Sequence, residues 1–252
     1  MQSAVAFLLF AVFALPCVAD CDTRVEKISD LVSQSTKNSE RAFADCKVWP
    51  ADPARTIVAV AALRQRSASG QPSTPDDGVY GLSVFVVTSS DGEILHRFID
   101  NDALPSDAIS LGGIAIDTAR YRLGNGVLAF GVTATRGNPR VEITSLDLYV
   151  AGSGGLQRVL KGLNVVRRFS EQQLANCYRN DETERTIAIA KSSTHGYADL
   201  LLTAKNSMSE PVTEPKPSAG HCASTLTLST KRYLLRFDGK RYQLPRAMKD
   251  ES

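Results

Sequence analysis

Residues 81–99 read GLSVFVVTSSDGEILHRFI, and this stretch decides the fold class. Val and Phe dominate its first half, Asp91-Gly92 interrupts it, and a second apolar run continues to Ile99. Asp-Gly between two such runs is the strongest short-range signal of a β-hairpin, because glycine adopts the positive φ angles that a tight turn requires. The stretch therefore predicts two antiparallel strands joined at Asp91-Gly92.

The pattern of two apolar runs around a turn recurs along the chain, and residues 56–63 add a further strand before the first hairpin. We expect hairpins over 119–135, 143–166, 186–204 and 233–244, turning at Asn125-Gly126, Gly152–Gly155, Ser193–Gly196 and Asp238-Gly239. The hairpin centres lie roughly 30 to 45 residues apart, a spacing typical of successive blades or repeated β-meanders. The expected fold is mainly β, an irregular propeller-like array of antiparallel β-hairpins with one N-terminal helix.

That helix is predicted over residues 22–35, where apolar residues recur at helical spacing and fall on one face. These residues are Val25, Ile28, Leu31 and Val32. A stripe of this kind is normally a face that packs on a core. A single helical turn is also expected before Cys177, because Ser170 and Gln173 have the spacing of a capping box.

An apolar leader precedes the helix. Residues 4–15 form an unbroken apolar run that Pro16 ends, and the small residues Cys17 and Ala19 suit a signal-peptidase site. We expect a cleaved signal peptide and a mature chain that begins at Asp20. The alternative is a membrane anchor, but the run is shorter than the roughly 18–20 apolar residues that span a bilayer. The expected divisions are a signal peptide (1–19), an N-terminal helix with a disulfide-tethered segment (20–50) and a β-rich domain (51–252).

Cysteine usage agrees with export. Once Cys17 leaves with the leader, Cys21, Cys46, Cys177 and Cys222 remain, an even number that suits disulfides in an oxidising compartment. Four cysteines allow three pairings, and proximity along the chain favours Cys21–Cys46 and Cys177–Cys222. The chain has no Asn-x-Ser/Thr acceptor, which favours a bacterial periplasm over a eukaryotic secretory route. We therefore expect a periplasmic protein without stable membrane insertion.

Residues that commonly carry catalysis or bind metals are sparse. The three histidines have no metal-ligand spacing, and no Gly-x-Ser-x-Gly nucleophile elbow is present. His195 lies beside Ser193 and Thr194, and we interpret it as a turn residue. Asp100, Asp102 and Asp107 resemble the carboxylates of a calcium loop, but Ala103, Leu104 and Pro105 occupy the places where alternating oxygen ligands and a glycine are needed. We interpret that segment as a solvated connector, and we expect no enzymatic activity, no cofactor and no metal.

The overall charge is nearly balanced, with 29 Lys and Arg against 27 Asp and Glu, so no strong field draws the chain to nucleic acid. Basic residues nevertheless concentrate near the predicted last hairpin. The plain interpretation is a solvated outer face of a sheet. The alternative is a surface for an acidic partner, with the candidate binding residues Arg232, Arg236, Lys240 and Arg241.

Two segments resemble a known group of proteins. Residues 193–201, STHGYADLL, resemble the repeat of FG-GAP-like and pseudo-β-propeller proteins, in which a turn leads into Gly-x-x-Asp-Leu and a strand. Residues 235–242, LRFDGKRY, are similar to the closing hairpin of exported bacterial proteins of that type, some of which are periplasmic lysozyme inhibitors or toxin-immunity proteins. The calcium-binding members have an Asp-rich turn, whereas only Asp199 remains here, which argues against calcium.

These observations lead to an exported periplasmic binding protein with a protein partner. The resemblance implies an inhibitor or immunity protein against a cell-wall-degrading enzyme or toxin. Many lysozymes are basic, so electrostatic steering would favour an acidic inhibitor, and the slightly basic chain counts against that particular target. The alternatives are a structural accessory of an envelope assembly and a hydrolase whose site is built from scattered residues.

Overall fold

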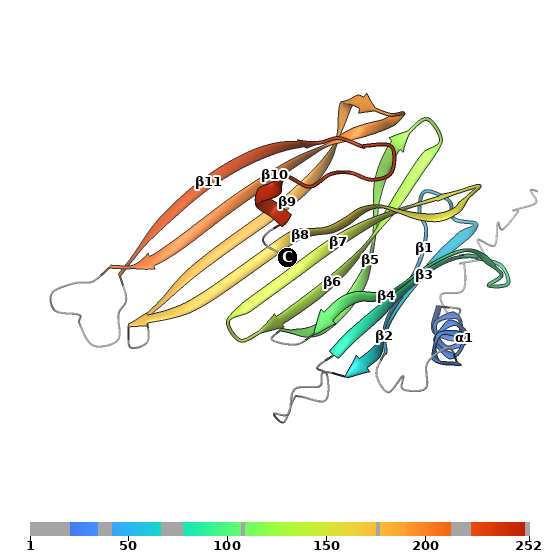
Figure 1. Cartoon of the computed structure of the whole chain (residues 1–252), viewed down its shortest axis with the longest axis horizontal. Helices are drawn as coiled ribbons and strands as arrows, with labels where there is room; N and C mark the ends of the chain where they lie inside the picture. Colours follow the sequence, from blue (N-terminus) through green and yellow to red (C-terminus); the bar gives the residue numbers. More distant parts are fainter. Residues whose placement is uncertain are drawn as a thin grey trace, which may run out of the picture.

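The computed structural model describes residues 21–34, 42–66, 78–106, 109–174, 177–212 and 223–249, which form a strand-rich fold with two helices (Figure 1). In chain order the elements are α1 (Cys21–Gln34), β1 (Ala42–Val48), β2 (Arg55–Arg66), β3 (Gly78–Thr88), β4 (Ile94–Ser106), β5 (Ser110–Gly124), β6 (Val127–Asn138), β7 (Val141–Gly152), β8 (Gly155–Leu174), β9 (Cys177–Thr194), β10 (Tyr197–Pro211), β11 (Ser224–Leu235) and α2 (Arg246–Lys249).

The strands make two antiparallel sheets. The first sheet holds β1 to β4 and the second holds β5 to β11, and each strand pairs with its neighbours in the chain. From β5 to β10 this order follows from the short turns, since a two-residue connection joins only adjacent antiparallel strands. The mainly β class, the antiparallel hairpins and the N-terminal helix are confirmed. In place of separate propeller-like blades, the hairpins pair edge to edge as two continuous sheets.

Four predicted turns join strands where we expected them, between β3 and β4, β5 and β6, β7 and β8, and β9 and β10. Gly92 and Gly126 have φ angles of 75° and 74° in two of these turns. A side chain at either position would meet steric strain, so glycine selects the place where the chain reverses. His195, which we expected in a turn, lies in the β9–β10 connection with a φ angle of 50°.

The helical turn expected at residues 170–173 is wrong. These residues continue β8 as far as Leu174, and Ser170 pairs with Asn180 of β9. Pairing with β9 provides partners for the backbone groups along this stretch, which a single turn of helix cannot do within itself. Capping-box spacing is a local signal, and the long-range strand pairing overrides it.

The last hairpin, expected over 233–244, forms only in part. Its first residues belong to β11 and pair with β10, and beyond them a single bridge joins Phe237 to Tyr242. Tyr242 instead donates its backbone N–H to the carbonyl oxygen of Val159 in β8 at 2.7 Å, so the chain folds back over the second sheet. Phe237 and Tyr242 are buried there, and their apolar contacts hold the segment in place.

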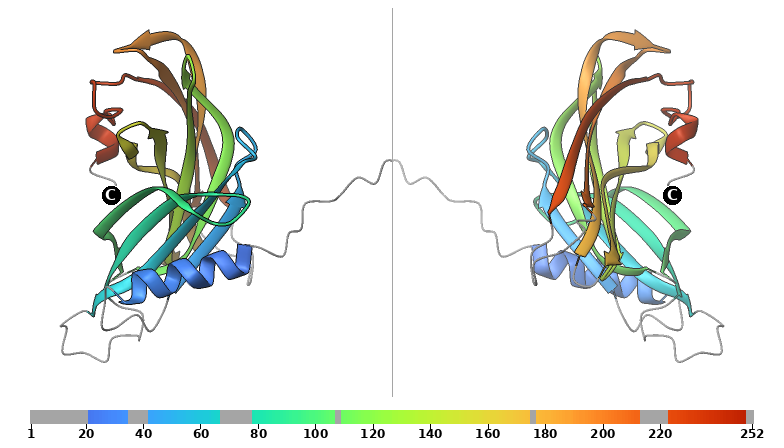
Figure 2. Two further views of the ribbon diagram at one scale, coloured as in Figure 1. Left: turned by 90° about the vertical axis from the view of Figure 1, so that its right-hand side faces the viewer. Right: turned by 90° about the vertical axis from the view of Figure 1, so that its left-hand side faces the viewer.

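Each face of the first sheet packs against another element. Its inner face packs against the second sheet around Trp49, Phe130 and Tyr149, with Phe130 stacked on Tyr149 at a centroid distance of 5.8 Å. Its outer face carries α1, which lies across the strands in Figure 2. Successive residues of a strand point to opposite faces, so Val84 of β3 points to the second sheet and Phe85 points to α1.

A disulfide between Cys21 and Cys46 ties α1 to β1, as the spacing favoured. Arg24 of α1 adds a hydrogen bond from its guanidinium to the hydroxyl of Thr56 at 2.8 Å. Cys177 is also disulfide-bonded, and its favoured partner Cys222 lies outside the described residues, as does the predicted signal peptide. Neither of the two helices in the described ranges is long and apolar enough to cross a bilayer.

The packing of the second sheet predicts a contrast between two leucines. Leu148 of β7 is 0% exposed, whereas Leu228 of β11 is 70% exposed. We expect Leu148→Ala to lower the free energy of unfolding by about 2–5 kcal/mol, because it removes buried methyl groups and leaves a cavity. The matched change Leu228→Ala is expected to stay within about 0.5 kcal/mol, as measured by urea unfolding. Equal losses for the two variants would contradict this packing.

Candidate functional site

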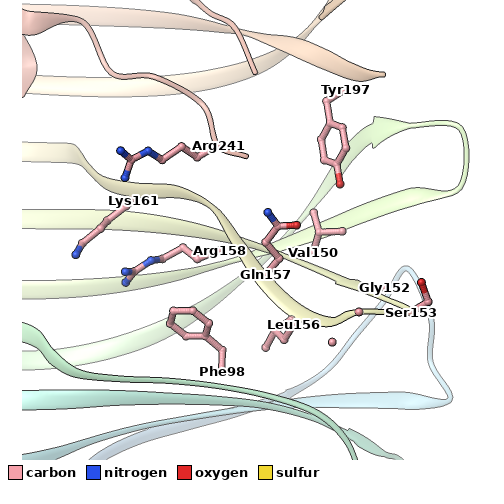
Figure 3. A pocket seen from close by; sticks show the side chains of 12 residues that line it. Phe98, Val150, Gly152, Ser153, Leu156, Gln157, Arg158, Lys161, Tyr197 and Arg241 are labelled. Atoms are coloured by element: carbon pink, nitrogen blue, oxygen red, sulfur yellow. The ribbon is translucent and has the colours of Figure 1, made fainter. Parts of the chain in front are cut away.

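A cleft of about 600 Å³ opens where β4 of the first sheet faces β8 of the second (Figure 3). The β7–β8 turn forms one end of this cleft, and the start of β10 and the segment after β11 complete its wall. The lining residues are Phe98, Val150, Gly152, Ser153, Gly154, Gly155, Leu156, Gln157, Arg158, Lys161, Tyr197 and Arg241.

Three cationic side chains meet at this cleft. It adjoins two smaller hollows of about 340 and 350 Å³, one beneath residues 241–248 and one between the two sheets. Lys161 lines all three spaces, and Arg158 and Arg241 each line two of them. Figure 3 shows the charged ends of the three side chains on the same side of the cleft. Basic residues more than eighty positions apart in the chain therefore converge.

Arg158 joins the two sheets through two carboxylates. Its guanidinium donates to Asp147 of β7 at 3.1 Å and to Asp100 of β4 at 2.8 Å, and it lies 5.0 Å from the ring centroid of Phe98. Asp100 was expected in a solvated connector, but the structure places it within β4 and half-buried. Charged hydrogen bonds of this geometry hold a guanidinium in one orientation, so Arg158 forms a rigid part of the cleft floor.

A β-bulge in β8 completes this network. The pairing of β7 with β8 shifts so that Asp147 lies opposite both Lys161 and Gly162, and Gly162 has a φ angle of 65°. The backbone N–H of Gly162 donates to Asp147 at 2.6 Å, and the hydroxyl of Tyr149 donates to it at 3.2 Å. Bulges re-aim neighbouring side chains, and this one places Lys161 in the cleft.

Burial and charge act in opposite directions on the two carboxylates. Burial raises the pKa of Asp147, although the charge of Arg158 and the N–H of Gly162 oppose that shift. Burial also acts against the charge of Asp100, but the hydrogen bond from Arg158 and the nearby Lys161 hold the pKa of that carboxyl below its ordinary value. Burial disfavours charge on Arg158, yet its two carboxylate partners raise the pKa of its guanidinium.

Lys161 and Arg241 leave the cleft with an excess of positive charge. The ammonium of Lys161 lies 3.9 Å from Asp100 and its side chain is 55% exposed, so this pair is weak. Arg241 is exposed and forms no ion pair with another described residue. Arg158 is already bonded to both Asp100 and Asp147, and the charge of Arg241 helps to lower the pKa of Asp238, which does not line the cleft. The arrangement suits an anionic group, with the rings of Phe98 and Tyr197 as flat walls for an apolar neighbour of that group.

A tight turn positions Arg241. One carboxylate oxygen of Asp238 accepts the backbone N–H groups of Lys240 and Arg241, both at 2.8 Å, and the other accepts the side-chain amide of Gln243 at 2.5 Å. Gln157 of β8 also donates to the carbonyl oxygen of Lys240 at 3.1 Å. These bonds fix the backbone from which Arg241 reaches the cleft.

The four candidate binding residues from the sequence do not form one patch. Arg241 lines the cleft, whereas Arg232, Arg236 and Lys240 are exposed outside it. Arg232 belongs to β11 and is paired in register with Thr203. The positive charge of Arg236 helps to lower the pKa of Asp199. The two basic residues that lie beside Arg241 in the cleft, Lys161 and Arg158, were not among the binding residues predicted from the sequence.

The two segments that carried the family resemblance lie against each other. Tyr197 stacks on Phe237 with ring centroids 4.1 Å apart, and the hydroxyl of Tyr242 donates to the carbonyl oxygen of Ala198 at 2.6 Å. A ring nitrogen of His195 also lies 3.0 Å from the carbonyl oxygen of Phe237. The contact anchors the returning segment, and thereby Arg241, beside the β9–β10 turn.

Asp199 braces that turn. One of its carboxylate oxygens accepts the hydroxyl of Ser192 and the other accepts the hydroxyl of Thr194, both at 2.7 Å. These two hydrogen bonds hold the pKa of Asp199 below its ordinary value.

Among the described residues no group of three or more His, Cys, Asp or Glu side chains is placed to hold a metal ion.

The network around Arg158 predicts a pH-dependent loss of stability. Arg158→Met leaves the buried carboxylate of Asp147 without its cation, and we expect the free energy of unfolding to fall by about 3–5 kcal/mol near neutral pH. Burial raises the pKa of Asp147, so the protonated form folds more favourably in this variant. The loss relative to wild type should therefore shrink as the pH falls toward the carboxyl range and grow as it rises.

Urea unfolding at neutral and mildly acidic pH measures this effect. Adding Asp147→Asn to Arg158→Met should recover part of the lost stability at neutral pH, because the second change removes the unpaired charge. Arg168→Met is the matched control, since Arg168 also bonds two carboxylates, Glu142 and Glu182, and lies 3.8 Å from a third, Glu184, but is half exposed. It should cost less than about 1 kcal/mol. A pH-independent loss in Arg158→Met would contradict the role of Asp147.

The turn that holds Arg241 predicts an unusual acid titration. The N–H groups of Arg241 and Lys240, with the amide of Gln243, lower the pKa of Asp238 from 3.8 to about 2. A carboxyl with a lowered pKa stabilises the turn above its ordinary pKa and loses that contribution as the pH falls through its folded value. We expect a midpoint at about 2 for Asp238 in a carboxyl NMR titration, with the amide signals of Lys240 and Arg241 following it. A midpoint at 3.8 would show that the turn is open in solution.

The chain was also compared with known proteins. These comparisons supply no relative from which a role could be taken, so the proposed function depends on the geometry of the cleft. No family model, no curated protein and no solved structure matches this chain.

Proposed function

We propose that this chain is an exported binding protein whose cleft holds an acidic group of a partner protein. The observation that supports this most strongly is the convergence of Arg158, Lys161 and Arg241 on one cleft whose described lining residues include no carboxylate. Carboxylates bind guanidinium and ammonium groups through charged hydrogen bonds, which are stronger than neutral ones. An acidic side chain that enters the cleft would therefore meet two exposed cations, Lys161, which has a weak ion pair with Asp100, and Arg241.

The surroundings of these cations favour a protein partner. Arginine and tyrosine are enriched among the residues that contribute most to binding at protein interfaces, and Arg241 and Tyr197 lie on the same wall of the cleft. Arg158 is held rigidly by Asp100 and Asp147, so little side-chain freedom is lost when a partner binds. The cleft is open, which suits a protruding loop.

The compartment and the kind of partner follow from other features. A disulfide between Cys21 and Cys46 and a further disulfide at Cys177 support export to the periplasm after removal of residues 1–19. The resemblance to exported inhibitor and immunity proteins suggests a cell-wall hydrolase or toxin as the partner. The charge of the cleft adds a condition: the partner presents acidic residues where it binds, even if its net charge is basic.

A role as a structural accessory of an envelope assembly is the second candidate, because the edge strand β11 carries exposed apolar residues. Leu226, Leu228 and Leu234 lie on one face of this strand, with Thr230 and Arg232 between the last two, and all three leucines are exposed. Among the described strands β11 pairs with β10 alone, so its other edge has no described strand beside it and could add a strand from a partner. This mode of binding would use backbone hydrogen bonds and apolar contacts and would be insensitive to the charge of the cleft.

Capture of partners from an envelope extract by the oxidised mature protein tests the proposal. We expect the wild type to retain a cell-wall hydrolase or toxin, identified by mass spectrometry. Lys161→Glu combined with Arg241→Glu should reduce its recovery by at least about tenfold. The two substitutions replace cations of the cleft with carboxylates, which repel the acidic group of the partner. The matched control is Lys27→Glu combined with Lys205→Glu, two exposed lysines outside the cleft, which should leave recovery unchanged.

A third variant separates the two candidate functions. Leu226→Ser combined with Leu228→Ser removes apolar surface from β11 and leaves the cleft intact. Loss of capture in this variant, with full capture in Lys161→Glu/Arg241→Glu, would replace the proposed function with the accessory role.

A further inference from the structure

A second groove, of about 630 Å³, lies on the outer face of the first sheet beside α1. It is on the opposite side of that sheet from the cationic cleft, because Phe85 of β3 lines it and packs with α1, whereas Phe98 of β4 points to the cleft. Residues of α1, β2, β3 and β4 line the groove, namely Leu31, Val32, Arg64, Ser83, Phe85, Ile94, Arg97, Ile99, Asn101 and Asp102.

The groove exists because α1 covers only part of the outer face. Beneath the helix, Val58, Val60 and Phe85 are buried. Beside it, Ile99 of β4 is 49% exposed and Leu31 of α1 is 47% exposed, and Ile94 is exposed as well. Covering apolar surface of this kind is favourable by roughly 25 cal/mol per Å². The walls of the groove therefore favour an aliphatic chain.

A guanidinium lies at this groove without an anion. The side chain of Arg64 crosses Gly81 so closely that its Nε would be 2.6 Å from a Cβ at that position, so glycine is what leaves room for it. The Nε of Arg64 is buried and makes no hydrogen bond, and Arg64 forms no ion pair with any described residue. Burial alone lowers the pKa of this guanidinium, which agrees with the lack of a nearby carboxylate.

Other polar residues line this groove, among them Ser83, Arg97 and Asp102. Ser83 is 1% exposed, and its hydroxyl is buried without a hydrogen-bond partner at the floor of the groove. Buried polar atoms are normally paired, so such a group indicates a site that a bound molecule or water completes. Arg97 and Asp102 also line the groove, and together with Arg64 they leave one positive charge in excess.

We propose that this groove binds a single-chain amphiphile with one negative charge, such as the carboxylate of a fatty acid. The carboxylate pairs with Arg64 and Arg97, and the aliphatic chain lies along Ile99, Ile94 and Leu31. A volume of about 630 Å³ is within the range of small-molecule sites. The site is independent of the cationic cleft, and no residue is shared between them.

Isothermal titration calorimetry of the oxidised mature protein with decanoate tests this site. We expect decanoate to bind the wild type, and 1-decanol, which has the same chain but no charge, to bind at least about tenfold more weakly. Arg64→Gln should weaken decanoate binding by a similar factor, because it removes the unpaired charge. Arg120→Gln, the matched change at an exposed arginine of β5, should leave the affinity unchanged.

A second variant tests whether decanoate binding depends on the position of the Arg64 guanidinium as well as on its charge. Gly81→Ala keeps Arg64 but displaces it from its place across β3 and also crowds the backbone of Asn101, so it should weaken decanoate binding more than 1-decanol binding. Thermal unfolding of each variant checks that the sheet is intact, and Ile99→Ser, at an exposed position, tests the chain contact if Gly81→Ala fails to fold. The proposal is overturned if the wild type binds decanoate more weakly than millimolar, or if Arg64→Gln binds it as well as the wild type does.

Discussion

One guanidinium connects the two sheets at the place where the candidate site lies. Arg158 of β8 bonds Asp147 on its own sheet and Asp100 on the other, so β4 and β8 are held at a defined separation. The opposite side of the sheet pair is joined by β1 and β5, where Asp45 accepts the backbone N–H of Ile116 at 2.7 Å. Between these two connections lies the aromatic core. The cleft is the space that remains beside Arg158 once the core is filled.

A cationic site therefore lies on each side of the first sheet, and the two sites differ in how their charges are paired. On the inner side, Lys161 and Arg241 stand beside a guanidinium whose charge is already matched by carboxylates. On the outer side, Arg64 has no such match, and exposed aliphatic residues surround it. An anion complements the positive charge at both places, through Lys161 and Arg241 on the inner side and through the partly buried Arg64 on the outer side. The two sites differ in what lies around the charge, aromatic rings in one and aliphatic chains in the other.

Local patterns predicted much of the fold. The turn at Asp91-Gly92 and the helix that begins near Asp22 depend on neighbouring residues alone, and both lie where they were expected. The capping-box spacing at 170–173 failed because pairing with β9 outweighs a weak local preference. The candidate site was harder to predict from the sequence. A glycine within an apolar strand pattern, Gly162, is a signal for a bulge, and it could have drawn attention to Lys161 beside it.

The sequence by itself determined the strand class, the turn positions, the amphipathic helix and a disulfide between Cys21 and Cys46, because each depends on residue periodicity, glycine conformation or short chain separation. Only the tertiary structure decided that hairpins merge into two sheets and that Arg158, Lys161 and Arg241 converge. Their convergence requires the register shift at Gly162 and the return of the chain after Phe237. Both depend on contacts between residues far apart in the chain, and no local pattern of residues encodes such contacts.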